Sequence, residues 1–141
     1  MSIIKDIRAF TVDSGKKSTD YTSQPKGHWI TDTLVANPMA IYPEYRGSRT
    51  SWGIGVLGSV VVEVELENGV IGVGISTAGP PGCWLIEHHL KQFAIGQNVT
   101  NVELIWDQMW RASMPYGRKG ITIHAISAID LAIWDAMGKD A

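Results

Sequence analysis

The chain has 141 residues, of which 45% are hydrophobic and 18% are charged, a composition typical of a globular domain with an apolar core. Its formal net charge is −2, so no basic excess suggests a nucleic-acid partner. The single cysteine, Cys83, excludes an internal disulfide and a site built from several thiolates. The N-terminus is charged and no apolar run is long enough to cross a bilayer, so we expect a cytoplasmic protein with no membrane partner.

Three segments favour β-strands. Residues 3–12 are short and rich in apolar side chains, which predicts a first strand. In residues 56–67 apolar side chains fall on one face of an extended chain, while Glu63, Glu65 and Glu67 fall on the other, so the second strand should have one buried face and one solvent-exposed face. Asn68-Gly69 is expected to supply the positive backbone angles of a tight hairpin turn, and residues 70–77 then return as the third strand. The predicted inner face of the second strand holds Val56, Val60, Val62, Val64 and Leu66.

The third strand carries two glycines, Gly72 and Gly74, on one face. Their missing side chains favour a close approach by another element. Beyond Pro80-Pro81 the apolar residues recur at helical spacing, which predicts a first helix. The apolar residues of this helix are Ile86, Leu90, Phe93 and Ala94.

Two further helices are expected. Thr100 with Glu103 three residues later matches a capping box, which predicts the start of a helix that ends at residues 114–117. The last helix should cover residues 121–137, with an apolar stripe along one side. Because the strands precede the helices, the sequence predicts an α+β fold in which a three-stranded antiparallel sheet is followed by a helical bundle. The stripe consists of Ile126, Ile129, Ile133 and Met137.

The segment from residue 13 to about residue 55 has little periodicity. It is much longer than roughly 12–15 residues, the length beyond which unstructured loops are uncommon in compact domains. Such a segment suits a lid over a binding site. It contains Arg46 and Arg49, whose guanidinium groups could hold a carboxylate through two parallel hydrogen bonds. It also contains His28 beside Trp29, and an imidazole could bind a polyol. The alternative, that these are ordinary solvated loop residues, stays open from the pattern alone.

No pattern in the sequence provides a complete catalytic set. Gly-x-Ser-x-Gly, a phosphate-cradling loop and His-Glu-x-x-His are all absent. His88 and His89 diverge by about 100° on a helix and cannot bind one metal ion together. Asp130 lies between two apolar residues, so we expect a partly buried carboxylate that needs a hydrogen-bond partner. Packing in the core or in an interface is expected for the helical tryptophans, Trp84, Trp106, Trp110 and Trp134.

The last helix carries a family resemblance. Its residues 127–139, Ser-Ala-Ile-Asp-Leu-Ala-Ile-Trp-Asp-Ala-Met-Gly-Lys, resemble the segment that ends the capping domain in the mandelate racemase branch of the enolase superfamily. Shorter matches extend over nearly the whole chain and are similar to L-rhamnonate dehydratases in order and spacing. They include Asp20-Tyr21, His28-Trp29-Ile30, Asn37-Pro38-Met39, Ser48-Arg49, Ser76-Thr77-Ala78-Gly79 and Asp107-Gln108-Met109.

The resemblance implies that residues 1–141 form an enolase-like N-terminal capping domain with a lid at about 13–55, and that the catalytic (β/α) barrel is absent from this chain. In such enzymes the barrel carries three acidic ligands for Mg²⁺ and a histidine base. The base removes the proton next to the substrate carboxylate, Mg²⁺ stabilises the enediolate, and hydroxide leaves from the neighbouring carbon to give a 2-keto-3-deoxy acid. This chain alone should therefore be inactive, with no catalytic residue and no metal ligand of its own.

The resemblance also assigns substrate binding to the lid. Arg49 matches the arginine of the family and is expected to bind the acid sugar together with His28, while Trp29 and Arg46 are further lid contacts. The full-length enzyme is expected to be a homo-oligomer that binds a small acid sugar. The implied activity converts L-rhamnonate into 2-keto-3-deoxy-L-rhamnonate and water.

Two other functions stay open. One is dehydration of a different acid sugar by an enzyme of the same superfamily, because lid residues tune that choice. The other is a non-catalytic binding module, since the sequence holds no complete catalytic set. The downstream sequence would separate them, because an enzyme should continue into repeated strand–helix units with acidic residues at the strand ends.

Overall fold

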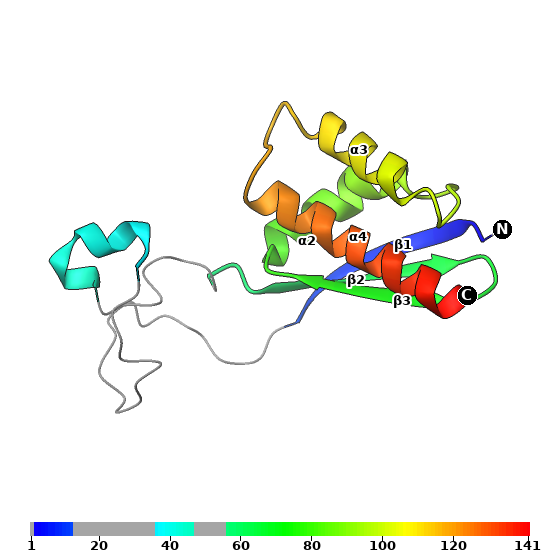
Figure 1. The fold of residues 1–141 in the computed structure, drawn as a ribbon, viewed down its shortest axis with the longest axis horizontal. Coiled ribbons are helices and arrows are strands. Elements are labelled where there is room, and N and C mark those ends of the chain that lie inside the picture. The colour runs from blue at the N-terminus through cyan, green and yellow to red at the C-terminus, as the bar shows by residue number, and fades with distance from the viewer. Residues whose placement is uncertain (1, 13–35, 47–55) are drawn as a thin grey trace. The chain divides into compact units, whose positions relative to one another are not determined.

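The computed structural model describes residues 2–12, 36–46 and 56–141. The chain divides into two compact units, one made of Met1–Asp13 with Gly58–Ala141 and the other of Ser14–Leu57. We call the first of these the core unit. It contains three strands followed by three α-helices, so the predicted α+β class is confirmed (Figure 1).

The sheet consists of three antiparallel strands in the order β1 (Ile4–Val12), β2 (Ser59–Leu66) and β3 (Ile71–Ser76). Alternate side chains of a strand point to opposite faces. One face of β2 is fully buried, whereas its glutamates lie on the other face and form ion pairs with Lys5 and Arg8 of β1. The predicted inner face is confirmed for Val60, Val62, Val64 and Leu66.

Two details of the sheet differ from the prediction. Val56 precedes β2 and is 52% exposed, because β1 ends opposite Ser59 and offers no partner to earlier residues. Ile4 and Ile7 are both buried, although strict alternation would place them on opposite faces. A shift in the pairing register between Ile4 and Asp6 accounts for this, since an extra residue in β1 turns the strand over.

The turn between β2 and β3 uses its two central residues differently from the prediction. Gly69 has a φ of 87°, but none of the described non-glycine residues has a positive φ, so Asn68 does not adopt the left-handed conformation. The side-chain oxygen of Asn68 instead accepts a hydrogen bond of 3.2 Å from the Val70 amide. The hairpin is confirmed, with Gly69 alone supplying the positive backbone angle.

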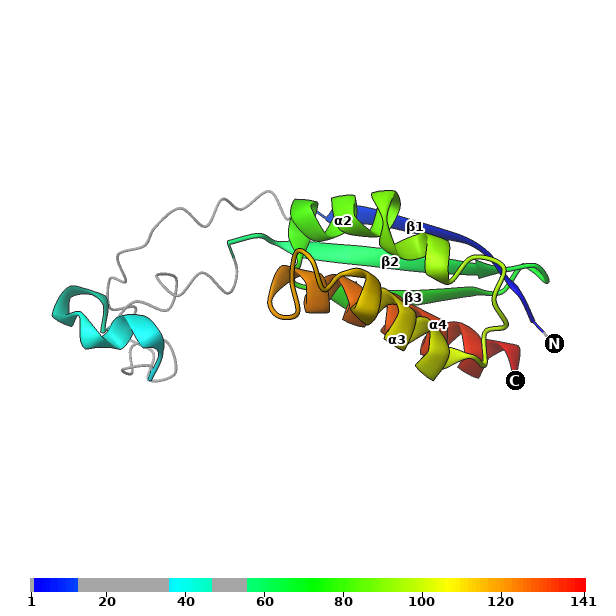
Figure 2. The same ribbon diagram turned by 90° about the horizontal axis from the view of Figure 1, so that it is seen from above.

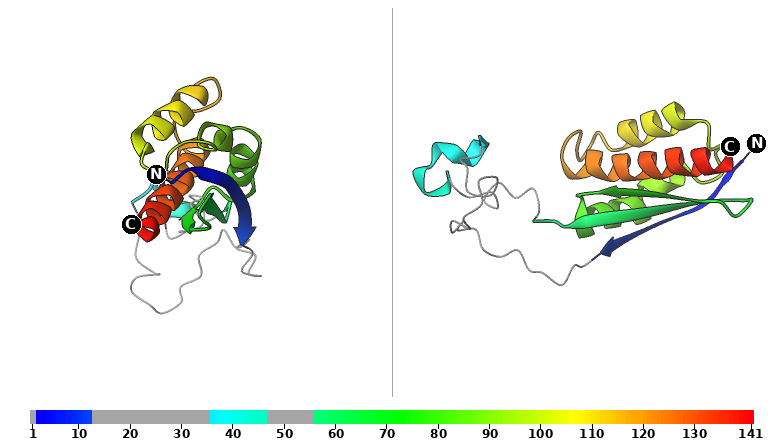
Figure 3. Two further views of the ribbon diagram at one scale, coloured as in Figure 1. Left: turned by 90° about the vertical axis from the view of Figure 1, so that its right-hand side faces the viewer. Right: turned by 60° about the horizontal axis from the view of Figure 1, so that its bottom comes forward.

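The helices cover one face of the sheet in two layers, as Figures 2 and 3 show from two directions. α2 (Gly79–His88) packs on β1 and β2, and α4 (Ile121–Asp140) packs on β2 and β3. α3 (Val102–Ala112) lies outside them against α4, and a short 3-10 helix, η3 (Leu90–Phe93), follows α2. Most of the predicted apolar residues are buried in this interior, namely Ile86, Leu90, Ala94, Ile126, Ile129 and Ile133, while Phe93 and Met137 are partly buried.

Two helix starts differ from the expectation. Pro80 and Pro81 lie in the first turn of α2 instead of before it, and there the missing amide hydrogen leaves no helical hydrogen bond unmade. The capping box predicted for α3 does not form, because Asn101 is the N-terminal cap and makes no side-chain hydrogen bond. The Thr100 hydroxyl and amide both donate to the side-chain oxygen of Asn98, each at 3.0 Å, so a local turn uses the group that the box required.

α4 lies directly on β3 because the inner face of that strand carries glycines. A Cβ added at Gly74 would lie 2.1 Å from the Ala128 carbonyl oxygen, and one added at Gly72 would lie 2.1 Å from that of Ala132. The predicted close approach is thus confirmed, and alanines on α4 form its other half. The expectation that no apolar run is long enough to cross a bilayer is wrong for α4 by length and composition, but core helices of globular domains share that composition, and α4 packs on the sheet here.

The free edge of β1 is covered by side chains from α2 and the residues that follow it. The Ala9 amide donates to Glu87 Oε1 at 2.6 Å, and Lys91 donates to the Ile7 carbonyl at 3.3 Å. The thiol of Cys83 donates to the Ala9 carbonyl at 3.0 Å. Glu87 and Lys91 also form an ion pair of 2.6 Å with each other, so one pair satisfies both kinds of backbone group on this edge.

The free edge of β3 is covered in the same way by α4. The Val73 amide donates to Asp135 Oδ2 at 2.7 Å, and Lys139 donates to the Ile71 carbonyl at 3.0 Å. Asp135 and Lys139 are again an ion pair of 2.6 Å, four residues apart. Unpaired strand edges readily bind other chains, so the two acid–lysine pairs close the sheet against such pairing.

We expect the Glu87 carboxylate to stabilise the core unit at neutral pH and to lose this effect in acid. Burial by itself raises the pKa of Glu87, but hydrogen bonds from Lys91 and from the Ala9 amide lower it overall, below its ordinary 4.5. A carboxyl group with a lowered folded-state pKa stabilises the fold above the unfolded-state pKa and loses that contribution as the pH falls through the folded-state value. Glu87→Gln should therefore cost about 1–2 kcal/mol at pH 7.

Urea unfolding at pH 7 and at a pH well below 4.5 measures this difference. The cost of Glu87→Gln should shrink in acid, where the wild-type carboxyl group is protonated as well. Glu67→Gln is the matched control, because Glu67 is exposed and should show little effect at either pH. An equal cost of Glu87→Gln at both pH values would mean that the charge of the carboxylate is not responsible.

Candidate functional site

One end of the core unit gathers several chain segments, and we call it the loop end. Val12 at the end of β1 pairs with Ser59 at the start of β2, so the segment between these strands leaves and re-enters the sheet here. Ser76 at the end of β3 pairs with Val60 at the same end. α2 and α4 also begin at this end of the sheet (Figure 1). Strand ends, helix starts and connecting segments therefore meet at the loop end.

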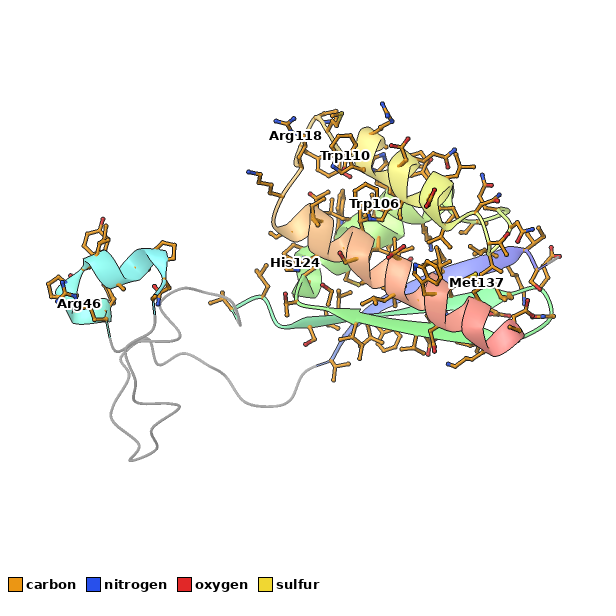
Figure 4. The ribbon with its side chains drawn as sticks, in the orientation of Figure 1. Arg46, Trp106, Trp110, Arg118, His124 and Met137 are labelled. Atoms are coloured by element: carbon orange, nitrogen blue, oxygen red, sulfur yellow. The ribbon has the colours of Figure 1, made fainter. Side chains whose placement is uncertain are left out.

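Three polar side chains lie together at the loop end. The Nδ1 atom of His124 is 3.4 Å from the Ser76 hydroxyl oxygen and 3.4 Å from that of Thr77. Both distances are at the long limit for hydrogen bonds, so both contacts are weak. His124 is exposed near the start of α4 (Figure 4). An exposed imidazole with two hydroxyl groups can bind a polar ligand, but these three groups contain no carboxylate to orient the imidazole as a base.

An open hollow of about 410 Å³ lies between the first turns of α2 and α4. Tyr116 contributes a phenol oxygen that lies 2.7 Å from His89 Nδ1, and burial raises the pKa of Tyr116. Trp84 is 59% exposed and stacks on His88. The hollow can hold an apolar group or another part of the protein, since none of its lining residues is charged. These residues are Pro81, Trp84, Leu85, Tyr116, Ile121 and Thr122.

The helical tryptophans do not form the core. Trp84 and Trp134 are exposed at 59% and 53%, whereas Trp106 and Trp110 are partly buried and stack on each other. The prediction of core or interface packing is confirmed for Trp106 and Trp110, which pack against the core. For Trp84 and Trp134 the core alternative is wrong, and packing in an interface stays a prediction.

The described part of the chain does not fit a Mg²⁺ site. Within residues 2–12, 36–46 and 56–141, no three His, Cys, Asp or Glu side chains are grouped so that they could hold a metal ion. His88 and His89 diverge, as expected, with His88 Nδ1 lying 2.9 Å from the Trp84 carbonyl oxygen while His89 faces Tyr116. Cys83 lies apart from them, and burial raises the pKa of its thiol.

The proposed lid residues lie mostly outside the described part of the chain. Arg46 alone is described, and it follows two short 3-10 helices, η1 (Pro38–Ile41) and η2 (Pro43–Tyr45). Its Nε donates to the Ala40 carbonyl at 3.2 Å, and its side chain is exposed. Its role as a lid contact stays a prediction. Arg49, His28 and Trp29 fall outside the described residues, so their binding roles stay predictions as well.

Sequence reasoning missed the function of the two acid–lysine pairs. The spacing of Glu87 with Lys91 and of Asp135 with Lys139 is typical of ion pairs on a helix surface. Their contacts with strand edges involve residues far away in the sequence, for which the spacing carries no signal. Hydrogen bonds from Lys139 and from the Val73 amide lower the pKa of Asp135. These carboxylates are therefore ionised structural groups and poor candidates for proton transfer.

Known proteins share this architecture and much of this sequence. Residues 34–141 match the family model of the mandelate racemase / muconate lactonizing enzyme, N-terminal domain. The chain is 55% identical over 136 residues to an L-rhamnonate dehydratase from Saccharopolyspora erythraea, a match that covers 96% of this chain and 34% of that protein. The crystal structure of rhamnonate dehydratase from Gibberella zeae complexed with Mg is similar with a TM-score of 0.83 and 45% identity, over 99% of this chain and 34% of that one.

A more distant similarity is to a dehydratase of a different acid sugar. The crystal structure of L-talarate dehydratase from Polaromonas sp. JS666, complexed with Mg and L-glucarate, has a TM-score of 0.52 and 28% identity to this chain. That similarity covers 58% of this chain and 24% of the dehydratase. The chain spans about a third of the length of the two rhamnonate dehydratases that it matches.

Proposed function

Because the chain belongs to the mandelate racemase / muconate lactonizing enzyme N-terminal domain family, we propose that it is the capping domain of a Mg²⁺-dependent hydro-lyase that dehydrates L-rhamnonate. The observation that carries this proposal is 55% identity to an L-rhamnonate dehydratase along 96% of the chain. A match of that extent includes the segment between β1 and β2, where lid residues set the choice of substrate in this proposal. We call a polypeptide in which residues 1–141 are joined to a catalytic barrel the parent polypeptide.

The capping domain binds substrate in this proposal, and the barrel performs the chemistry. The described residues do not fit a metal site, so we assign the Mg²⁺ ligands and the catalytic base to the barrel. Arg49 and His28 bind the carboxylate and hydroxyl groups of the acid sugar, with Trp29 and Arg46 as neighbouring contacts. A cytoplasmic location and a homo-oligomeric parent polypeptide belong to the same proposal.

The experiment is an assay of the parent polypeptide with L-rhamnonate and Mg²⁺. We expect formation of 2-keto-3-deoxy-L-rhamnonate, measured as the 2-keto acid, and loss of activity when a chelator removes the metal. The isolated 141-residue chain is the matched control and should be inactive under the same conditions. A parent polypeptide that binds Mg²⁺ but leaves L-rhamnonate unchanged would refute the substrate assignment.

The second candidate is dehydration of a different acid sugar. The similarity to L-talarate dehydratase at 28% identity favours this alternative over a non-catalytic module. The same assay separates the two activities when L-talarate and other six-carbon acid sugars replace L-rhamnonate. A higher kcat/KM for one of them than for L-rhamnonate would select the second candidate.

A further inference from the structure

A second hollow lies on the opposite side of α4 from the sheet, between α3 and α4. We call it the α3–α4 pocket. Its volume is about 230 Å³, and its lining includes two carboxylates, those of Asp130 and Glu103, and two indole rings. Figure 4 shows Trp106 in the space between the two helices. The residues that line the pocket are Val102, Glu103, Trp106, Asp130 and Trp134.

Asp130 is the unusual member of this pocket. Within the described part of the chain, no group donates a hydrogen bond to its carboxylate or forms an ion pair with it. Asp135 pairs with Lys139 and Asp107 with Arg111, whereas Glu103 of the same pocket also has no such partner among the described residues but is exposed. Asp130 is half-buried, and this burial raises its pKa. A partly buried charge without a partner costs stability, so the isolated domain bears a cost at this position.

The surroundings of Asp130 have the composition of an interface core. Leu131 and Trp134, on α4 beside Asp130, are 51% and 53% exposed. Interfaces place aromatic anchors at their centre and pair each charge that they bury. The chemical complement of a carboxylate between two indole rings is a guanidinium group, because it is planar, stacks on aromatic faces and donates paired hydrogen bonds to carboxylates.

We propose that the α3–α4 pocket binds an arginine side chain of the catalytic barrel. This side chain enters between Trp106 and Trp134 and pairs with Asp130. This inference rests on the proposed function, which supplies the barrel. The matched relatives are about three times as long as this chain, so a large polypeptide is available to cover an apolar face of this kind. The arginine satisfies the carboxylate, and the exposed Leu131 beside it on α4 packs against the barrel surface.

The test is the substitution Asp130→Asn, made both in the isolated chain and in the parent polypeptide. Asparagine keeps the shape of the side chain and removes its charge. In the isolated chain the midpoint of thermal unfolding should stay the same or rise, because an unpaired, partly buried charge is removed. In the parent polypeptide the midpoint should fall by several degrees, because the arginine loses its partner. The matched control is Asp107→Asn on α3, which breaks only an exposed pair with Arg111 and should shift both proteins equally.

The sign of the effect decides the proposal. A fall of the midpoint in the parent polypeptide without a fall in the isolated chain supports docking of an arginine. A neutral or stabilising effect of Asp130→Asn in both proteins overturns it, as does a loss of stability in both. Sedimentation of the isolated chain tests the other occupant, because a dimer that Asp130→Asn dissociates would place a second copy in the pocket and overturn the proposal for the barrel. The L-rhamnonate assay of the unmodified parent polypeptide is independent, so a wrong substrate leaves this test intact.

Discussion

Replacing Gly74 with alanine is expected to destabilise the core unit strongly, although the change adds a single methyl group. The new Cβ would lie 2.1 Å from the Ala128 carbonyl oxygen and 2.7 Å from the Ala132 nitrogen, and both are backbone atoms of α4. Backbone cannot rotate away as a side chain can, so the whole helix would have to move off β3. Overpacking a core costs about 1–3 kcal/mol and more when backbone shifts, so we expect about 3 kcal/mol or more from a total of about 5–15 kcal/mol.

Gly138→Ala is the matched control for this substitution. Gly138 lies on α4, the helix that Gly74 contacts, and nothing occupies the space within 4 Å of an added Cβ. Alanine favours helix over glycine by up to about 1 kcal/mol, so the identical chemical change should here raise stability. Urea unfolding followed by circular dichroism measures both effects. A Gly74→Ala chain as stable as the wild type would show that α4 does not rest on β3 as described.

Arg49→Lys in the parent polypeptide is expected to lower kcat/KM for L-rhamnonate by about 10- to 100-fold. Lysine keeps the positive charge but loses the planar fork that binds a carboxylate through two hydrogen bonds. A hydrogen bond to a charged group contributes about 1.5–3 kcal/mol, and each 1.4 kcal/mol corresponds to about a factor of ten in rate. Steady-state kinetics with L-rhamnonate give the measurement, and the melting temperature shows whether the variant is folded.

Arg46→Lys provides the comparison for this arginine. Arg46 lies three residues earlier, and its Nε already binds the Ala40 carbonyl within its own turn. We expect a much smaller loss, because a group held locally contributes less to a ligand. If Arg46→Lys lowered kcat/KM strongly while Arg49→Lys left it unchanged, Arg46 would be the arginine that binds the substrate. Neutral results for both would mean that the lid holds the substrate without its arginines, and the substrate assignment would lose its best local support.

The local patterns of the sequence predicted the three strands and the three α-helices of the core unit. The alternation in β2 and the helical periods of α2 and α4 predicted which side chains are buried, because burial of one face is what selects such patterns. Gly72 and Gly74 even predicted a close approach, although the sequence did not identify α4 as the element that makes it. The errors arose where two local solutions compete. The Thr100 hydroxyl binds the Asn98 side chain in a local turn instead of capping α3, although the sequence is compatible with both arrangements.

Residue types and the family resemblance were enough to predict candidate site residues. The spatial arrangement of a site could not be predicted from the sequence. Arginine and histidine in a long segment indicate a carboxylate or polyol ligand, but the spacing of residues in such a segment does not determine where their side chains meet. The grouping of His124 with the hydroxyls of Ser76 and Thr77 had no local signal, since it joins the end of β3 to the start of α4. The same holds for Asp130, whose flanking residues predicted partial burial but not the α3–α4 pocket around it.

By itself the sequence determined the α+β class, the order of strands and helices and the family, because these depend on periodicity, turn residues and motifs that are written within short stretches of chain. Only the tertiary structure determined which polar and charged groups have hydrogen-bond or ion-pair partners. It joined Glu87 with Lys91 to one sheet edge and Asp135 with Lys139 to the other, and it left Asp130 without a partner in the described part of the chain. Hydrogen bonds and charge pairs of this kind depend on the distance in space between residues roughly 60 or more positions apart, which no local pattern encodes.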